Sequence, residues 1–136
     1  MPRTKVTVPD VAEAAPGLWS NAIRAGDTLY ISGQVARPFE GGTGMVGKAE
    51  YEQTRQIFSR IERIVKAAGG TMDDIVKTTV YLLDGQDRSV FLDAYGEQFR
   101  RRLRSPWMPA GLTMTVDALR PDCLVEIDAV AWLGAR

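Results

Sequence analysis

The 136-residue sequence contains no histidine, and this absence limits the chemistry that the protein can perform. Histidine is the usual general base at neutral pH and the commonest protein ligand for transition metals. Catalytic arrangements in which a histidine activates a serine or cysteine nucleophile are therefore excluded. Zinc would need cysteine or carboxylate ligands, and the one cysteine and the scattered acidic residues show no metal-binding spacing. We predict no metal ion and no cofactor.

Long apolar runs, net charge and paired cysteines are also missing from the sequence. No apolar run approaches the roughly 20 residues that span a bilayer, and residues 1–10 lack the apolar core of a signal peptide. Basic and acidic residues number 17 each, so no overall positive field attracts a phosphate backbone. The single cysteine, Cys123, has no partner for an internal disulfide. These features favour a cytoplasmic protein that has neither a membrane nor nucleic acid as its partner.

The length and the 45% content of hydrophobic residues predict a single domain that spans residues 1–136. Strands that alternate with two helices favour an α+β fold, in which a mixed sheet carries both helices on one face. The last two strands are expected to meet as a hairpin around a turn at 120–122. In chain order, we expect strands at 5–8, 18–24 and 28–32, a helix at 48–68, a strand at 75–83, a helix at 87–102, and strands at 112–119 and 124–133.

The second face of such a sheet also needs cover. A sheet with helices on one side only can hide its remaining apolar surface by oligomerising, and a closed ring is the economical arrangement. In the last two strands, the apolar side chains that we expect to form this remaining surface are Val116, Val125, Ile127, Ala129 and Ala131.

Several segments, spread over nearly the whole chain, resemble the Rid (YjgF-like) family in order and in approximate spacing. They are YISGQ at 30–34, AAGG at 67–70, DIVKTTVY at 74–81, PA at 109–110 and RPDCLVEIDAVA at 120–131. The resemblance implies a chorismate-mutase-like fold and a homotrimer that binds small-molecule substrates in clefts between its subunits. It also implies a deaminase that acts on enamines or imines. An upstream pathway enzyme would supply these substrates.

Three positions depart from the deaminases that the sequence resembles. Those enzymes hold the substrate carboxylate with an arginine directly after the Pro-Ala pair, where this chain has Gly111. A planar guanidinium matches a carboxylate in shape and charge, and glycine provides neither. An aromatic hydroxyl on the early strand is replaced by Trp19, and an asparagine on the second helix is replaced by Leu92. We therefore expect a changed ligand.

Other positions keep the family pattern. Glu126 matches the family's glutamate, which can activate a water molecule for attack on a C=N carbon. On an alternating strand, Glu126 points away from the buried Val125 and Ile127, although it also fits an ordinary surface residue. Ser32 offers a hydrogen bond at the same site, or it merely ends its strand. We add to the expected substrate-binding set Gly33, Gln34 and Thr113.

Two features of the sequence carry positive charge that could have a function. Arg37, in the glycine-rich loop after Ser-Gly-Gln, is the best candidate to replace the lost cation, although a solvent-exposed loop charge fits the sequence better. The basic run at 100–104 fits a solvated helix end, which the helix dipole favours, or a contact with RNA.

These residues support three hypotheses. The first is a Rid-like hydrolase or deaminase that acts on a reactive imine, enamine or related small metabolite, with altered specificity because Gly111 replaces the carboxylate-binding arginine. The second is a non-catalytic trimer that binds a small metabolite as a sensor or scaffold. The third, an RNA-binding or ribonuclease activity, is supported only by the basic run.

Overall fold

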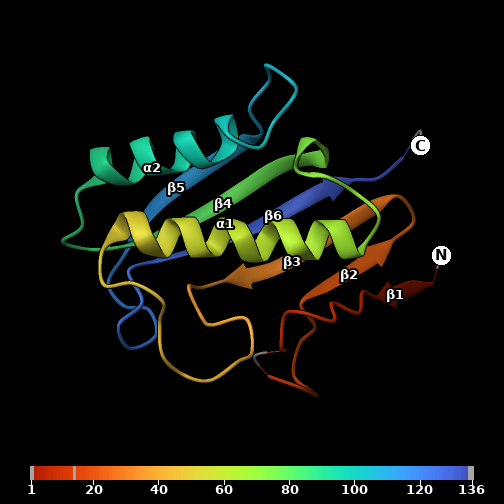
Figure 1. Cartoon of the computed structure of the whole chain (residues 1–136), viewed down its shortest axis with the longest axis horizontal. Coiled ribbons are helices and arrows are strands. Elements are labelled where there is room, and N and C mark those ends of the chain that lie inside the picture. The colour runs from red at the N-terminus through yellow and green to blue at the C-terminus, as the bar shows by residue number, and fades with distance from the viewer. Residues whose placement is uncertain (1, 14, 135–136) are drawn as a thin grey trace.

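The computed structural model describes residues 2–13 and 15–134, which form an α+β fold with two long helices over a mixed sheet. Figure 1 shows both helices on the same face of the sheet, which confirms the predicted architecture and the predicted order of strands and helices. In the described ranges, neither helix has the length and apolar character that a membrane crossing requires. The elements are β1 (Arg3–Lys5), β2 (Ala22–Ala25), β3 (Thr28–Gln34), α1 (Glu50–Ala67), the short 3-10 helix η1 (Met72–Asp74), β4 (Ile75–Leu83), α2 (Arg88–Arg100), β5 (Ala110–Val116) and β6 (Val125–Trp132).

The strands form one sheet in the order β1-β2-β3-β6-β4-β5. The predicted hairpin of the last two strands is therefore wrong, because β4 lies between β5 and β6. The cause is the β4-α2-β5 crossover, which returns the chain parallel to β4 on the sheet's outer edge. β6 then enters the sheet between β3 and β4 and pairs antiparallel with both. The first strand also lies earlier than the predicted 5–8.

The core lies between the helices and one face of the sheet. Along β6, every second residue is buried against the helices, including Val125 and Ile127, both 0% exposed. The same holds for Ala129 and Ala131, so these four residues are not the surface that calls for an oligomer, and that part of the prediction is wrong. The uncovered face instead carries the exposed side chains of Tyr30, Leu112, Met114 and Trp132.

An aromatic cluster fixes α2 against α1. The ring of Phe58 on α1 meets those of Tyr95 and Phe99 on α2 edge-on, with centroids 5.6 and 4.8 Å away. Such contacts add to the free energy gained by burying the rings. The Tyr95 hydroxyl then lies 2.6 Å from that of Thr78 on β4, so the position of α2 relative to the sheet is fixed by a polar contact as well.

Candidate functional site

A cavity with a volume of about 470 Å³ opens where β3 ends. This size lies within the usual range for small-molecule sites. The wall is built from β3, the start of β6, the segment before β2, the loops after β3 and before β6, and one residue of α1. Its lining residues are Trp19, Asn21, Ser32, Gly33, Gln34, Val35, Arg37, Arg60, Arg120 and Glu126.

A β-bulge shapes the floor of this cavity. The register between β3 and β6 passes from Ile31 opposite Ala129 to Gln34 opposite Ile127, so Ser32 and Gly33 together oppose one residue. Bulges redirect side chains and occur often beside active sites. Here the Ser32 hydroxyl donates a hydrogen bond of 2.6 Å to the carbonyl of Ser20, which ties the bulge to the segment that carries Trp19.

Glu126 reaches the cavity from β6 and packs against the bulge. A Cβ atom at position 33 would overlap the Glu126 Oε2 atom, so only glycine leaves room for the carboxylate there. Burial raises the pKa of the Glu126 carboxyl group; Arg120 opposes this rise, and Asp128 adds to it. A half-buried carboxylate with a raised pKa is a better proton acceptor than an exposed one.

Arg60 braces the opposite wall from α1. Its Nε donates to Gln34 Oε1 at 3.0 Å, and its Nη1 donates to the carbonyls of Arg37 and Pro38 at 3.2 and 3.0 Å. Gln34 in turn donates to the carbonyl of Ser32 at 3.1 Å. Burial and the neighbouring arginines lower the pKa of Arg60 to about 10, so its guanidinium stays charged at neutral pH.

Arg37 is buried, with only 7% of its surface exposed, and this contradicts the expectation of a solvent-exposed loop charge. Its Nη1 donates to the carbonyl of Gly42 at 2.9 Å, while its buried Nε has no hydrogen-bond partner in the described part of the chain. Burial, then the charge of Arg120, lower the pKa of the Arg37 guanidinium.

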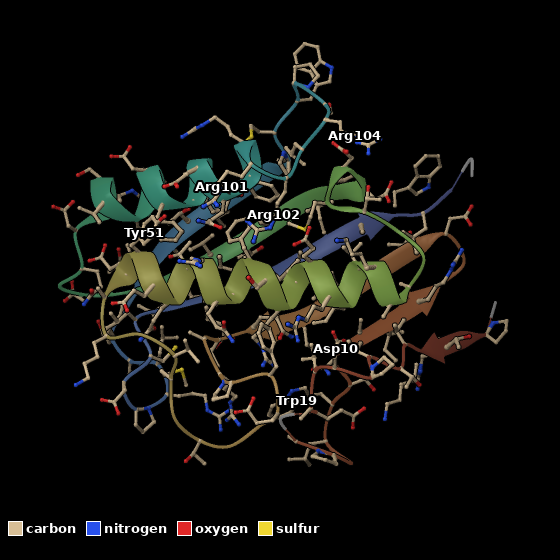
Figure 2. The ribbon with its side chains drawn as sticks, viewed as in Figure 1. Asp10, Trp19, Tyr51, Arg101, Arg102 and Arg104 are labelled. Carbon is tan, nitrogen blue, oxygen red and sulfur yellow. The ribbon has the colours of Figure 1, made fainter. Side chains whose placement is uncertain are left out.

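The structure brings together six of the nine residues that the sequence assigned to the site. They are Trp19, Ser32, Gly33, Gln34, Arg37 and Glu126. The other three, Leu92 on α2 and Gly111 and Thr113 on β5, do not line this cavity. Figure 2 shows Trp19 on the opposite side of the molecule from α2, and β5 lies at the sheet edge with β4 and β6 between it and β3.

The surroundings of Gly111 explain its small size in part. A Cβ atom there would lie 3.2 Å from the Thr78 hydroxyl oxygen and 3.7 Å from that of Tyr95. A residue with a Cβ atom at this position needs the Thr78 hydroxyl to shift by a few tenths of an ångström, whereas the Tyr95 hydroxyl is at an ordinary contact distance.

Sequence reasoning missed two arginines of the cavity, Arg60 and Arg120. A usable signal existed for Arg60, because it lies three residues after Ile57 and four before Ile64, on the buried face of α1. An arginine at such a position is placed there for a specific contact. For Arg120, the sequence indicated only that the residue lies in a turn at 120–122.

Cys123 does not take part in this chemistry. It is buried, its Sγ donates to the carbonyl of Val125 at 3.3 Å, and burial raises the pKa of its thiol to about 11. Within residues 2–13 and 15–134, no group of three or more His, Cys, Asp and Glu side chains is placed to hold a metal ion.

The same fold occurs in known proteins. The sequence profile of the family described as Endoribonuclease L-PSP matches residues 10–133. The chain belongs to this family, also called YjgF/RidA. A RutC family protein of Pyrococcus horikoshii is 38% identical over 117 residues, which cover 85% of this chain and 87% of that protein.

Two further members of the L-PSP family are informative. A mouse protein named 2-iminobutanoate/2-iminopropanoate deaminase is 35% identical over 130 residues, covering 96% of this chain and 92% of that protein. The crystal structure of a Rid protein from Yersinia pestis is similar with a TM-score of 0.84 at 30% identity, over 96% of this chain and 99% of the other. The predicted fold and family are thereby confirmed.

Two arginines of the basic run at 100–104 form ion pairs in this L-PSP family member. Figure 2 shows Arg101 and Arg102 between the two helices. Arg101 pairs with Glu97 at 3.5 Å, and Arg102 pairs with Glu62 of α1 at 3.3 Å. The Arg102 pair ties the end of α2 to α1, whereas the Arg101 pair lies within α2 and its C-cap.

Proposed function

We propose that the protein is a hydrolase, or deaminase, that acts on a reactive imine or enamine in this cavity. The observation that carries the proposal is the Glu126 carboxylate, which is half-buried, has a raised pKa and lies against Gly33 in a cleft of ligand size. Family membership and the activity named for the mouse relative support the same reaction class.

The reaction needs little beyond orientation and one proton acceptor. Glu126 takes a proton from a water molecule as the water oxygen attacks the C=N carbon, and the nitrogen receives a proton. The carbinolamine then collapses to a carbonyl compound and ammonia or an amine. An enamine first takes up a proton on carbon to become the imine. Because imines are already electrophilic, positioning supplies much of the acceleration, without a histidine or a metal ion.

A neighbouring subunit would complete the cleft. Leu92, Gly111 and Thr113 lie on the far edge of the sheet, so within one chain they cannot contact a ligand beside Glu126. In a ring of three subunits, the β5 edge of one subunit would face the cavity of the next. Gly111 then leaves the family's carboxylate position without a cation, and we propose that the substrate lacks the usual α-carboxylate geometry.

Two alternatives remain distinct from this proposal. A non-catalytic sensor or scaffold would use the same cavity and would not need the proton acceptor that Glu126 provides. An RNA-binding role would need free basic charge at the end of α2, where Arg101 and Arg102 are ion-paired.

The proposal is tested with three imines whose hydrolysis can be followed directly. The first is N-benzylidene-methylamine, the second is its analogue with a carboxylate on the ring carbon opposite the C=N group, and the third is the imine formed from 2-aminoacrylate. We expect the protein to accelerate loss of at least one of the first two well beyond the spontaneous rate. Spontaneous rates for all three imines, with the protein folded, would contradict the proposal and favour the sensor.

A further inference from the structure

The cavity carries more positive than negative charge. Among the residues that line it, three are arginines and only one, Glu126, is acidic. None of the three arginines forms an ion pair with a carboxylate in the described ranges, whereas several arginines elsewhere do. Two of these arginines, Arg37 and Arg60, are buried, whereas Arg120 is exposed. A buried charge without a counterion costs free energy, and an anionic ligand removes that cost.

Arg37 is the clearest sign of a missing ligand group. It is more than nine-tenths buried, its Nη1 contacts only a neutral carbonyl, and its Nε lacks a partner. A buried donor without a partner is rare in folded proteins and calls for an explanation such as a bound group. Arg37 also lines the cavity, together with Arg120 from the turn before β6.

Arg60 has a different part in this arrangement. Its guanidinium is already occupied by Gln34 and by the carbonyls of Arg37 and Pro38. Arg60 therefore holds the loop that carries Arg37 in place, and its positive charge adds to that of the cavity lining. The groups free to contact a ligand directly are the guanidiniums of Arg37 and Arg120.

We infer that Arg37 and Arg120 form an oxyanion-binding subsite of this cavity, which takes a carboxylate or phosphate group of the substrate away from the reacting carbon. Planar guanidiniums bind such groups through paired, charge-assisted hydrogen bonds. The inference rests on the proposed function in so far as the bound anion belongs to a substrate, but anion binding at the subsite does not depend on catalysis. It places the cation on the β3 side of the cleft, whereas the family's arginine belongs to the position of Gly111 on β5.

The subsite is tested first by binding. Acetate and inorganic phosphate are titrated into the protein by calorimetry at constant ionic strength, with acetamide as the uncharged control. Arg120→Gln and Arg37→Gln should each weaken binding of the anions by about ten- to a hundredfold. Arg55→Gln, which removes an exposed arginine of α1 outside this cavity, should leave the affinity unchanged. Which anion binds more tightly identifies the group that the subsite prefers.

Glu126→Gln separates this inference from the proposed function. Because that change removes the one negative charge lining the cavity, anion binding should tighten severalfold. Turnover should be lost. Arginine-dependent anion binding in a protein that accelerates no imine would uphold the subsite and contradict the hydrolase.

A kinetic comparison gives a second readout. The ratio of kcat/KM for the ring-carboxylated imine to that for the uncharged imine should fall about tenfold or more in Arg120→Gln and not in Arg55→Gln. Anion affinities and ratios that are unchanged in both cavity variants, or lowered equally by Arg55→Gln, would overturn the subsite.

Discussion

The carboxylate of Glu126 lies so close to the backbone of Gly33 that any side chain at position 33 would overlap it. Two features create this contact: the β-bulge of β3 at Gly33, and the alternation of β6, which turns Glu126 away from the buried residues Val125 and Ile127. They bring together two strand residues that lie far apart in the sequence. The position of the Glu126 carboxylate is therefore set by the sheet and not by a loop.

Gly33→Ala should displace the carboxylate without unfolding the protein. Gly33 does not have a positive φ, so alanine meets only the movable end of Glu126. We expect turnover to fall by about tenfold or more, in line with misplacement of a general base. Gly44→Ala is the matched control, because no atom lies within 4 Å of a Cβ there and its φ is not positive. Equal turnover in both variants would show that the contact is unimportant.

The charges around Glu126 should set the acid limb of the pH profile. Activity requires the deprotonated carboxylate, so it is lost as pH falls through the Glu126 pKa. Arg120 lowers that pKa and Asp128 raises it. The acid limb of kcat/KM should thus move to higher pH in Arg120→Gln and to lower pH in Asp128→Asn. If the acid limb of kcat/KM stays at the same pH in both variants, the group that titrates there is not Glu126.

The exposed face of the sheet predicts a trimer. Tyr30, Leu112 and Trp132 are each at least half exposed on that face, and such apolar surface marks an interface. Sedimentation should give three times the chain mass of 15.0 kDa. Leu112→Asp should dissociate the assembly, whereas Val90→Asp, on the exposed side of α2, should not. A stable folded monomer of the unchanged protein would contradict the trimer.

The protein should be a poor deaminase for 2-aminoacrylate. A missing charge-assisted contact to the carboxylate costs about 1.5 to 3 kcal/mol, or roughly ten- to a hundredfold and more in rate. Coupling to a serine dehydratase and following ketoacid release measures this against a relative that has arginine after the Pro-Ala pair. Comparable acceleration by the two proteins would show that Gly111 matters little.

Local pattern predicted the elements better than their arrangement. β4 has the predicted bounds of 75–83, and the helices begin and end within two residues of prediction. The alternation of apolar residues does not show which strands are neighbours. The short connection between the last two strands favours a hairpin, but in the structure the parallel crossover from β4 puts β5 at the edge of the sheet.

For the site, too, the sequence predicted individual residues better than their arrangement in space. The family pattern indicated Ser32, Gly33 and Glu126, and these three residues line one cavity. It could not reveal that Arg37 is buried or that Arg120 joins it, because both depend on how the loops at 35–49 and 117–124 fold back over the sheet. Charges on loops are solvated in most sequences, and only tertiary contacts show when they are not.

The most direct test of the account is the turnover of Glu126→Gln on whichever of the three imines the unchanged protein hydrolyses fastest. Glutamine keeps the shape and hydrogen-bonding capacity of the side chain and removes the proton acceptor. The account predicts a loss of about a hundredfold or more with the oligomer intact. Unchanged turnover would contradict it and identify the cavity as a binding site beside which imines hydrolyse on their own.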